Sequence, residues 1–158
     1  MIGNLFHLGG KAILALSMAA FLIPGCSRAD DYSHIRAKEK RAQALCELLS
    51  SEAFGFPVHR WSYLVPDSIW DGEFAREIVD LGEHSLPYLE PLLNDQTRVV
   101  IAGSEYAALS EAYRLRVCDF AFRYWCQIHQ LEYKFFIFQE ERDRYRNQLV
   151  SRVGSPFK

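Results

Sequence analysis

The sequence lacks the short motifs that mark many enzymes. It contains no HExxH, GxSxG, Walker A or GxGxxG pattern, so neither a zinc protease, a serine hydrolase nor a nucleotide-binding protein is indicated. It also lacks a CxxC pair, which leaves a structural zinc site or a thioredoxin-like centre without support. We therefore predict no catalytic residue, no metal and no cofactor.

The chain also lacks a charge excess. Its 18 basic and 20 acidic residues give a net charge of −2. Residues 1–25 contain one basic and no acidic residue, so without them the balance is 17 against 20, or −3. This balance offers no signature of phosphate binding, and no nucleic-acid partner is predicted. The 158 residues, 49% of them apolar, suffice for one globular domain.

Long apolar runs are absent except for AILALSMAAFLIP at residues 12–24, which follows Lys11. Its thirteen residues would reach about 20 Å as a helix. The hydrocarbon core of a bilayer is about 30 Å thick, so the run is short for a transmembrane helix and typical of a secretory signal. Pro24 disfavours helix at the residue before it, which predicts an extended chain just before Cys26.

The segment IPGC at residues 23–26 resembles the lipobox of bacterial lipoproteins. It has a branched aliphatic residue, Ile23, a small residue, Gly25, and then Cys26; Pro24 departs from the commoner alanine or serine, and Ile23 from leucine. The resemblance implies that the leader is cut before Cys26 and that this cysteine carries diacylglyceryl lipid. Several acyl chains would anchor the protein stably in a membrane.

The lipobox resemblance also implies a domain organisation and a location. Residues 1–25 are then a signal peptide, residues 26–33 a lipidated N-terminus with a short tether, and residues 34–158 a single helical domain. Ser27, where aspartate would retain the protein at the inner membrane, favours the outer membrane. The alternative is an ordinary secretory leader, or an uncleaved anchor, with Cys26 incidental.

Helical periodicity predicts an all-α fold class, a compact domain of about five helices with one long ordered loop. The helix at 113–129 is the most apolar and is expected at the centre. Residues 99–112 are ambiguous, because strand-like RVVIA precedes a helix-like stretch. The expected helices are 33–53, 71–82, 85–94, 113–129 and 139–153, the expected loop is 55–70, and the predicted core includes Val117, Ala121, Tyr124, Ile128 and Leu149. The inner side of the last helix is expected to carry Phe138, Tyr145, Leu149 and Val153.

A set of spaced residues resembles a HEAT-type helical hairpin. It comprises Gly82, Pro87, Leu92, Leu93 and Asp95, then Arg116, Val117, Ala121 and Ile128. The resemblance implies two packed helices within residues 81–128. The connection between them is longer than in such repeats, and no second copy is present, so a compact domain around one hairpin is predicted rather than a solenoid.

Three cysteines remain in the expected domain: Cys46, Cys118 and Cys126. On one helix, Cys118 and Cys126 would lie about 12 Å apart, which is too far for a disulfide. A bridge would therefore need Cys46 with one of them. The favoured interpretation is three buried thiols that act as small apolar groups.

Two groups of side chains stand out as candidate functional or structural features. His59, Arg60, Trp61 and Tyr63 lie in the expected loop, where exposed aromatics can anchor a partner; the alternative is that they fold into the core. Arg116, Asp119 and Arg123 form a polar stripe on an apolar helix, with Asp119 at pairing distance from both arginines. Arg142 is expected either to snorkel to the surface or to meet Asp119, and His129 to be a structural buried histidine.

The function class favoured by these observations is a membrane-anchored binding or interaction module of the bacterial cell envelope, facing the periplasm or the surface. Its expected partner is a protein or another component of the envelope. One alternative is an exported enzyme with a site assembled from scattered residues such as His59, Glu83, His84 and Asp119. Another is an immunity or inhibitor lipoprotein that neutralises a toxin.

The lipobox resemblance makes one direct prediction. Mass spectrometry of protein extracted from membranes should give the mass of residues 26–158 plus lipid, because cleavage before Cys26 and acylation would both have occurred. Recovery of an unmodified Cys26, or of the chain with residues 1–25 attached, would contradict it.

Overall fold

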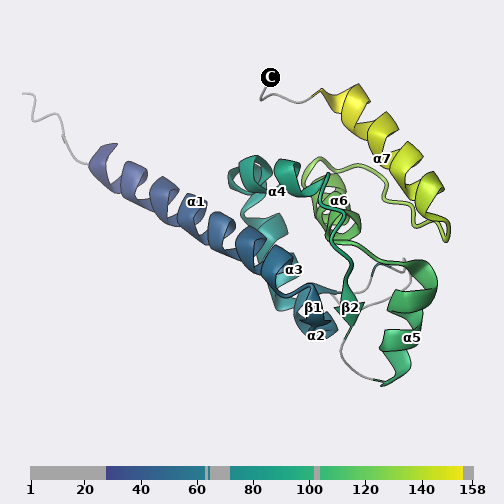
Figure 1. Ribbon diagram of the computed structural model, residues 1–158. Helices are drawn as coiled ribbons and strands as arrows, with labels where there is room; N and C mark the ends of the chain where they lie inside the picture. Colours follow the sequence, from purple (N-terminus) through teal and green to yellow (C-terminus); the bar gives the residue numbers. More distant parts are fainter. Residues whose placement is uncertain (1–27, 63, 65–71, 102–103, 155–158) are drawn as a thin grey trace, which may run out of the picture.

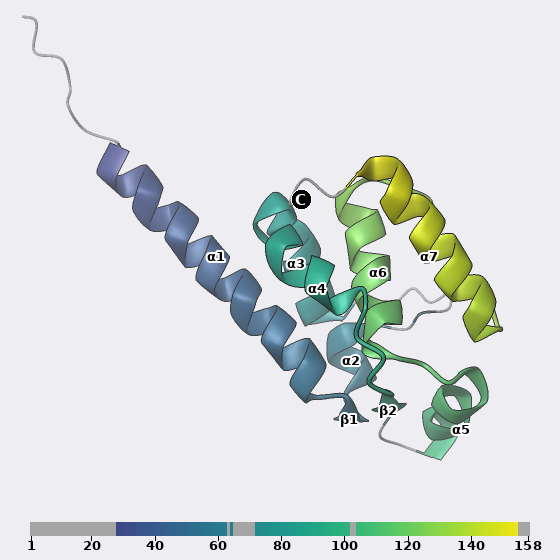
Figure 2. The same cartoon turned by 45° about the horizontal axis from the view of Figure 1, so that its top comes forward.

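The apolar helix near the C-terminal third of the chain lies at the centre of the fold, as predicted. In the computed structural model, this helix is α6 (Val117–Ile128), which is buried from Val117 to Cys126. It is shorter than the expected 113–129, because Tyr113 ends a separate helix and Arg114 has a φ of +49°. The helices α3 (Glu73–Asp80) and α4 (Leu86–Leu92) pack on one side of it, and α7 (Gln139–Val153) lies on the other (Figures 1 and 2). All other elements are arranged around this helix.

The structure describes residues 28–62, 64, 72–101 and 104–154. Within them the order is α1 (Arg28–Ser51), β1 (Phe54–Phe56), α2 (Val58–Trp61), α3, a 3-10 turn η1 (Gly82–His84), α4, β2 (Val100–Ile101), α5 (Ser104–Tyr113), α6 and α7. The predicted all-α fold class is confirmed. Seven α-helices take the place of about five, because α2 forms in the expected loop and α5 in the ambiguous segment. Cys26, the leader at 1–25 and Tyr63 lie outside the described residues.

The first helix is longer than the sequence indicated. α1 begins at Arg28 rather than near Ser33, so most of the expected tether is helical. From Tyr32 onward, Ala42 is the first buried residue of α1, and Figure 2 shows the part of the helix before it projecting from the body of the protein. We call residues 28–41 the α1 arm.

No helix within the described residues combines the length and the apolar character needed to cross a membrane.

The prediction of a loop at 55–70 is wrong for its first residues, where the structure has the end of β1 and the helix α2. β1 pairs in parallel with β2, with Phe54 opposite Val100 and Phe56 opposite Ile101, and α2 follows directly. Gly55 has a φ of +79°, a left-handed conformation that glycine adopts without steric cost. The strand-like stretch RVVIA does contain β2, but a parallel pair joins residues far apart in sequence, so no local pattern marks the pairing itself.

The two helices of the expected hairpin, α4 and α6, do pack against each other. α4 has seven residues, with Pro87 in its first turn, as predicted, and Pro91 inside it. The connection to α6 contains β2 and α5, which matches the long linker seen in the sequence.

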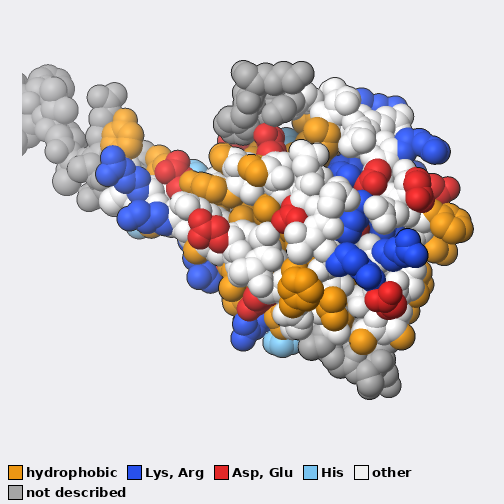
Figure 3. Space-filling view, viewed as in Figure 1, with side chains coloured by type: hydrophobic (Ala, Val, Ile, Leu, Met, Phe, Trp, Pro, Cys, Tyr) orange, Lys and Arg blue, Asp and Glu red, His pale blue; other side chains and the backbone are white. Residues whose placement is uncertain are grey.

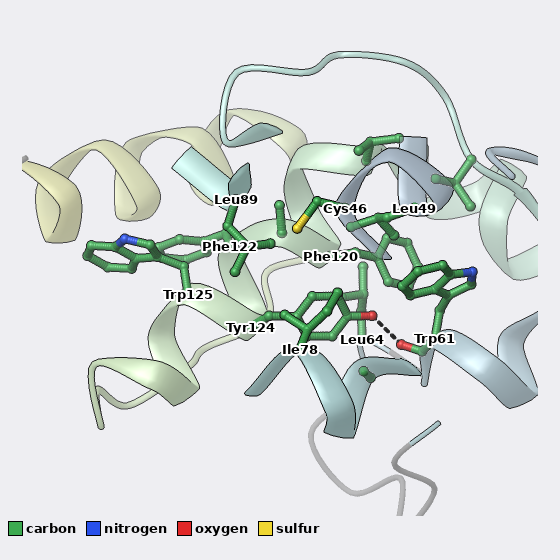
Figure 4. Close-up of a cluster of buried hydrophobic side chains, with 14 of the residues drawn as sticks. Cys46, Leu49, Trp61, Leu64, Ile78, Leu89, Phe120, Phe122, Tyr124 and Trp125 are labelled. Atoms are coloured by element: carbon green, nitrogen blue, oxygen red, sulfur yellow. Dashed lines mark hydrogen bonds between the residues drawn. The ribbon is translucent and has the colours of Figure 1, made fainter. Parts of the chain in front are cut away.

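Aromatic side chains fill the core around α6. Figure 4 shows Tyr124 hydroxyl donating to the Trp61 carbonyl, with Phe120 beside them. The ring centroids of Phe56 and Phe120 are 4.5 Å apart. Of the predicted core, Val117, Ala121 and Tyr124 are fully buried, while Ile128 and Leu149 are partly buried against it.

The predicted inner side of α7 is only half correct. Tyr145 and Leu149 pack against the core, but Phe138 and Val153 are 65% and 40% exposed. The buried residues of α7 are instead Arg142 and Arg146. Because α7 is held mainly by buried arginines, its buried side has no continuous apolar stripe by which the sequence could indicate it.

The cysteines of the domain are buried and free, as predicted, although the Cys118 sulfur also accepts a contact from Arg146 at 3.5 Å. Burial raises the pKa of each thiol, Cys46, Cys118 and Cys126, to about 12. They are therefore neutral and poor nucleophiles near pH 7.

The packing of α6 predicts that Ala121→Arg unfolds the domain. Ala121 is fully buried, and a long charged side chain there would need both space and water that the core does not provide. Gln127→Arg, at an exposed position of the same helix, is the control and should melt like wild type. A wild-type melting temperature for Ala121→Arg, measured by circular dichroism, would contradict the inward position of Ala121 on α6.

Candidate functional site

The prediction that the loop around Trp61 binds a partner is wrong for Trp61 itself. Trp61 is fully buried; its ring lies 5.3 Å from that of Phe74, and its indole N–H donates to Glu52 at 2.7 Å. α2 turns Trp61 inward onto α6, so this indole offers no surface to a partner. The structural alternative, aromatics folded into the core, is correct here.

The neighbours of Trp61 do not rebuild such a site. His59 is exposed, whereas Arg60 is half-buried with its guanidinium 3.3 Å from Glu52 and its central carbon 5.4 Å from the Phe74 ring centre. Arg60 thus fastens α2 to its surroundings. Tyr63 lies outside the described residues.

The polar stripe of α6 is buried in a charged cluster. Arg116, Asp119 and Arg123 are 2%, 3% and 8% exposed. Asp119 accepts from the Arg116 backbone N–H at 3.1 Å and from its guanidinium at 2.9 Å, as the spacing predicted. Arg123 places its guanidinium carbon 6.0 Å from the ring centre of Tyr133.

Helix α7 supplies the rest of the charged cluster. Arg142 lies 3.2 Å and Arg146 3.9 Å from Asp119, so Arg142 meets Asp119 rather than snorkelling to the surface. Asp143 accepts from Arg116 at 2.8 Å and from Arg146 at 2.6 Å. Sequence reasoning missed Arg146 and Asp143. The only sequence feature that could have indicated them is the four-residue spacing of Arg142 and Arg146 around Asp143. That spacing by itself is typical of an ordinary solvent-exposed helix face.

Hydrogen bonding in this cluster favours the charged forms. Burial opposes the charge on Arg116, but hydrogen bonds to Asp143 and Asp119 outweigh it and raise the Arg116 pKa. Burial likewise disfavours the Asp143 carboxylate, yet hydrogen bonds from Arg116 and the nearby arginines lower its pKa below the usual value. Both shifts keep Arg116 and Asp143 charged near pH 7, so their contact is an ion pair and not an acid–base device.

A groove runs between α1 and α4, and we call it the α1/α4 groove. It has a volume of about 470 Å³. Its walls are Gln43, Cys46, Glu47, Ser50 and Ser51 from α1 and Pro87, Tyr88, Pro91 and Leu92 from α4. Gln43 and Glu47 are joined by a 2.8 Å hydrogen bond along one wall. Sequence reasoning did not select these residues. The sequence feature that could have indicated the groove is the spacing of Pro87, Tyr88 and Pro91 on a short helix.

A second hollow of about 510 Å³ adjoins the groove and shares Pro87 and Tyr88 with it. It is also lined by Glu39, Glu83, His84, Leu86 and His129. Glu83 and His84, two residues of the alternative enzyme site, thus meet here, but His59 and Asp119 are not among its lining residues. His129 packs on Trp125, with ring centres 4.3 Å apart, but it is only partly buried, not buried as predicted, and its Nε2 is a buried atom with no hydrogen-bond partner among the described residues.

Within the described residues, no group of three or more His, Cys, Asp or Glu side chains is arranged to hold a metal ion. Comparison with protein-family models, with curated proteins and with solved structures finds no significant match. The site must therefore be interpreted from its own chemistry.

The buried ion pairs predict a large effect of Asp119→Asn. Loss of this carboxylate leaves three arginines short of a counter-charge, so we expect a loss of about 3–5 kcal/mol in the free energy of unfolding at pH 7, measured in urea. Glu111→Gln is the control, because Glu111 pairs with Arg98 on the surface with a side chain 75% exposed; its effect should stay below about 1 kcal/mol. Equal stability of Asp119→Asn and wild type would contradict the structural role of the cluster.

Proposed function

We propose that this protein is an exported, lipid-anchored helical binding module of the bacterial envelope. We further propose that the α1/α4 groove is the surface that holds its protein partner. The observation that carries this proposal is the groove itself, an apolar hollow between two helices at the body end of α1. Helix-lined apolar grooves with a few polar groups are a common mode of binding for protein segments.

The position of Cys26 relative to α1 supports an anchored module. Only Ser27 separates Cys26 from the first helical residue, Arg28. The 24 residues of α1 span about 36 Å, so a lipid on Cys26 would be tied to the groove by one continuous helix. The groove would then work within a fixed reach of the membrane. The arm also carries Arg36, Lys38 and Lys40, basic groups suited to anionic headgroups (Figure 3).

The charges around the groove indicate the chemistry of the partner. Across the groove and the adjoining hollow, the charged lining residues are Glu39, Glu47 and Glu83, and no Lys or Arg is among the described lining residues. The floor is apolar, with Tyr88 and Leu92 both partly buried. We therefore propose that the occupant is an apolar protein segment with basic flanks, since acidic rims select such segments electrostatically. An immunity or inhibitor lipoprotein would be one form of this function.

The meeting of Glu83, His84 and His129 in the adjoining hollow favours one second candidate, an exported enzyme with an acid–base site. This candidate predicts turnover that is lost in His84→Gln while folding is retained. The binding module predicts instead that His84→Gln leaves the affinity for a groove peptide nearly unchanged.

Selection from a random peptide library displayed on phage tests the groove. Peptides enriched on wild-type protein should have apolar centres flanked by Lys or Arg. They should bind the Ser51→Arg variant at least about tenfold more weakly, because that change places a bulky cation in the groove and costs about 1.4 kcal/mol or more. Ser51 is exposed at the end of α1, so the variant should fold.

Gln148→Arg makes a comparable charge change at an exposed position of α7 outside the groove, and it should bind the selected peptides like wild type. Enrichment of acidic peptides, or equal binding to Ser51→Arg and wild type, would contradict the proposed occupant.

A further inference from the structure

The buried cluster between α6 and α7 carries more positive than negative charge. The side chains of Arg116, Arg142 and Arg146 are 3%, 4% and 6% exposed, and they face the carboxylates of Asp119 and Asp143. Arg123 of the same cluster is also buried, so the buried arginines outnumber the two carboxylates and the cluster carries a surplus of positive charge. Buried charge without a counter-charge is unfavourable, so each guanidinium needs other acceptors.

Arg142 and Arg116 find those acceptors within the protein. Arg142 donates to the carbonyls of Phe136 and Ile137, both at 2.9 Å, and to that of Tyr113 at 2.8 Å. Arg116 donates to Gln96 at 2.6 Å besides its two carboxylates. Most of the hydrogen-bond donors of these two arginines therefore have acceptors within the protein.

Arg146 has the weakest set of partners. It shares Asp143 with Arg116, lies 3.9 Å from Asp119, and directs its other terminal nitrogen to the Cys118 sulfur at 3.5 Å. Burial raises the pKa of Cys118 to about 12, so this sulfur belongs to a neutral thiol, a weak acceptor. Among Arg116, Arg142 and Arg146, Arg146 therefore has the fewest strong acceptors, and it is the one that lines a hollow.

A hollow of about 320 Å³ between α4 and α7 reaches this arginine, and we call it the α4/α7 pocket. Its polar lining comprises Arg146, Asn94, Asn147, Ser151 and Glu90, and its apolar lining Leu93 and Val150. It lies on a different side of α4 from the α1/α4 groove, which is lined by Pro87, Tyr88, Pro91 and Leu92. The amides and the hydroxyl can donate hydrogen bonds toward a ligand that Arg146 attracts.

We propose that the α4/α7 pocket binds a small monocarboxylate with a short aliphatic body. A carboxylate matches the planar guanidinium of Arg146 and supplies the missing negative charge. Leu93 and Val150 provide apolar contact for the aliphatic part. Glu90, an acid in the same lining, disfavours dianions such as phosphate or sulfate. This inference does not depend on the lipid anchor or on the occupant of the α1/α4 groove.

Thermal unfolding of the full domain with sodium butyrate tests the pocket, with sodium chloride at the same ionic strength as reference. Butyrate should raise the melting temperature in a saturable way, by about 3–6 °C at ten times its Kd. Phosphate and sulfate, at equal ionic strength, should give no saturable rise. No saturable rise with butyrate, or an equal one with phosphate and sulfate, would overturn the proposal.

Asn147→Asp provides the decisive variant, because it leaves the buried cluster intact and places a carboxylate in the pocket. It should melt at a higher temperature than wild type without added anion, and butyrate should have no further effect. Gln148→Asp adds the same charge one residue later at an exposed position outside the pocket, so it should keep the butyrate response. A butyrate response in Asn147→Asp equal to that of wild type would also overturn the proposal.

Discussion

The burial of Asp119 is the constraint on which the C-terminal half of this protein depends. A carboxylate 2% exposed must be surrounded by donors, and here they come from the start of α6 and from α7. Because the partners are arginines, they bring their own need for acceptors. That need draws in Asp143, Gln96 and the carbonyls of Tyr113, Phe136 and Ile137. One buried charge thus helps to fix the mutual position of several elements, beside the apolar contact of Phe122 on α6 with Tyr145 on α7.

The two long helices are attached to the central α6 in different ways. α1 joins the body through an apolar face of Ala42, Leu45, Cys46 and Leu49, the usual arrangement for an amphipathic helix. α7 joins it through Arg142 and Arg146, with Tyr145 and Leu149 adding partial apolar burial. An apolar contact tolerates small shifts, whereas ion pairs with short, directed hydrogen bonds do not. The α7 attachment is therefore the more specific of the two.

The short helix α4 organises both hollows proposed to bind ligands. Its prolines and Tyr88 face the α1/α4 groove, while Glu90 and Leu93 face the α4/α7 pocket. Proline inside a helix removes a backbone hydrogen bond and keeps the helix short, which leaves open space beside longer neighbours. The two hollows differ in character, since acids dominate the charges of the first and a buried arginine dominates the second. A single short element can thus support two kinds of recognition.

The sequence by itself determined the fold class, the central helix and the pairing of Arg116 with Asp119, because these follow from local periodicity and spacing. It also carries the lipobox resemblance, which no contact in the folded domain bears on. Only the tertiary structure decided that Trp61 points inward, that β1 pairs with β2, and that the inner face of α7 is made of arginines. Each of these depends on residues far apart in the chain. Arginines at a helical spacing give the same sequence pattern whether their guanidinium groups lie in water or pair with a buried carboxylate.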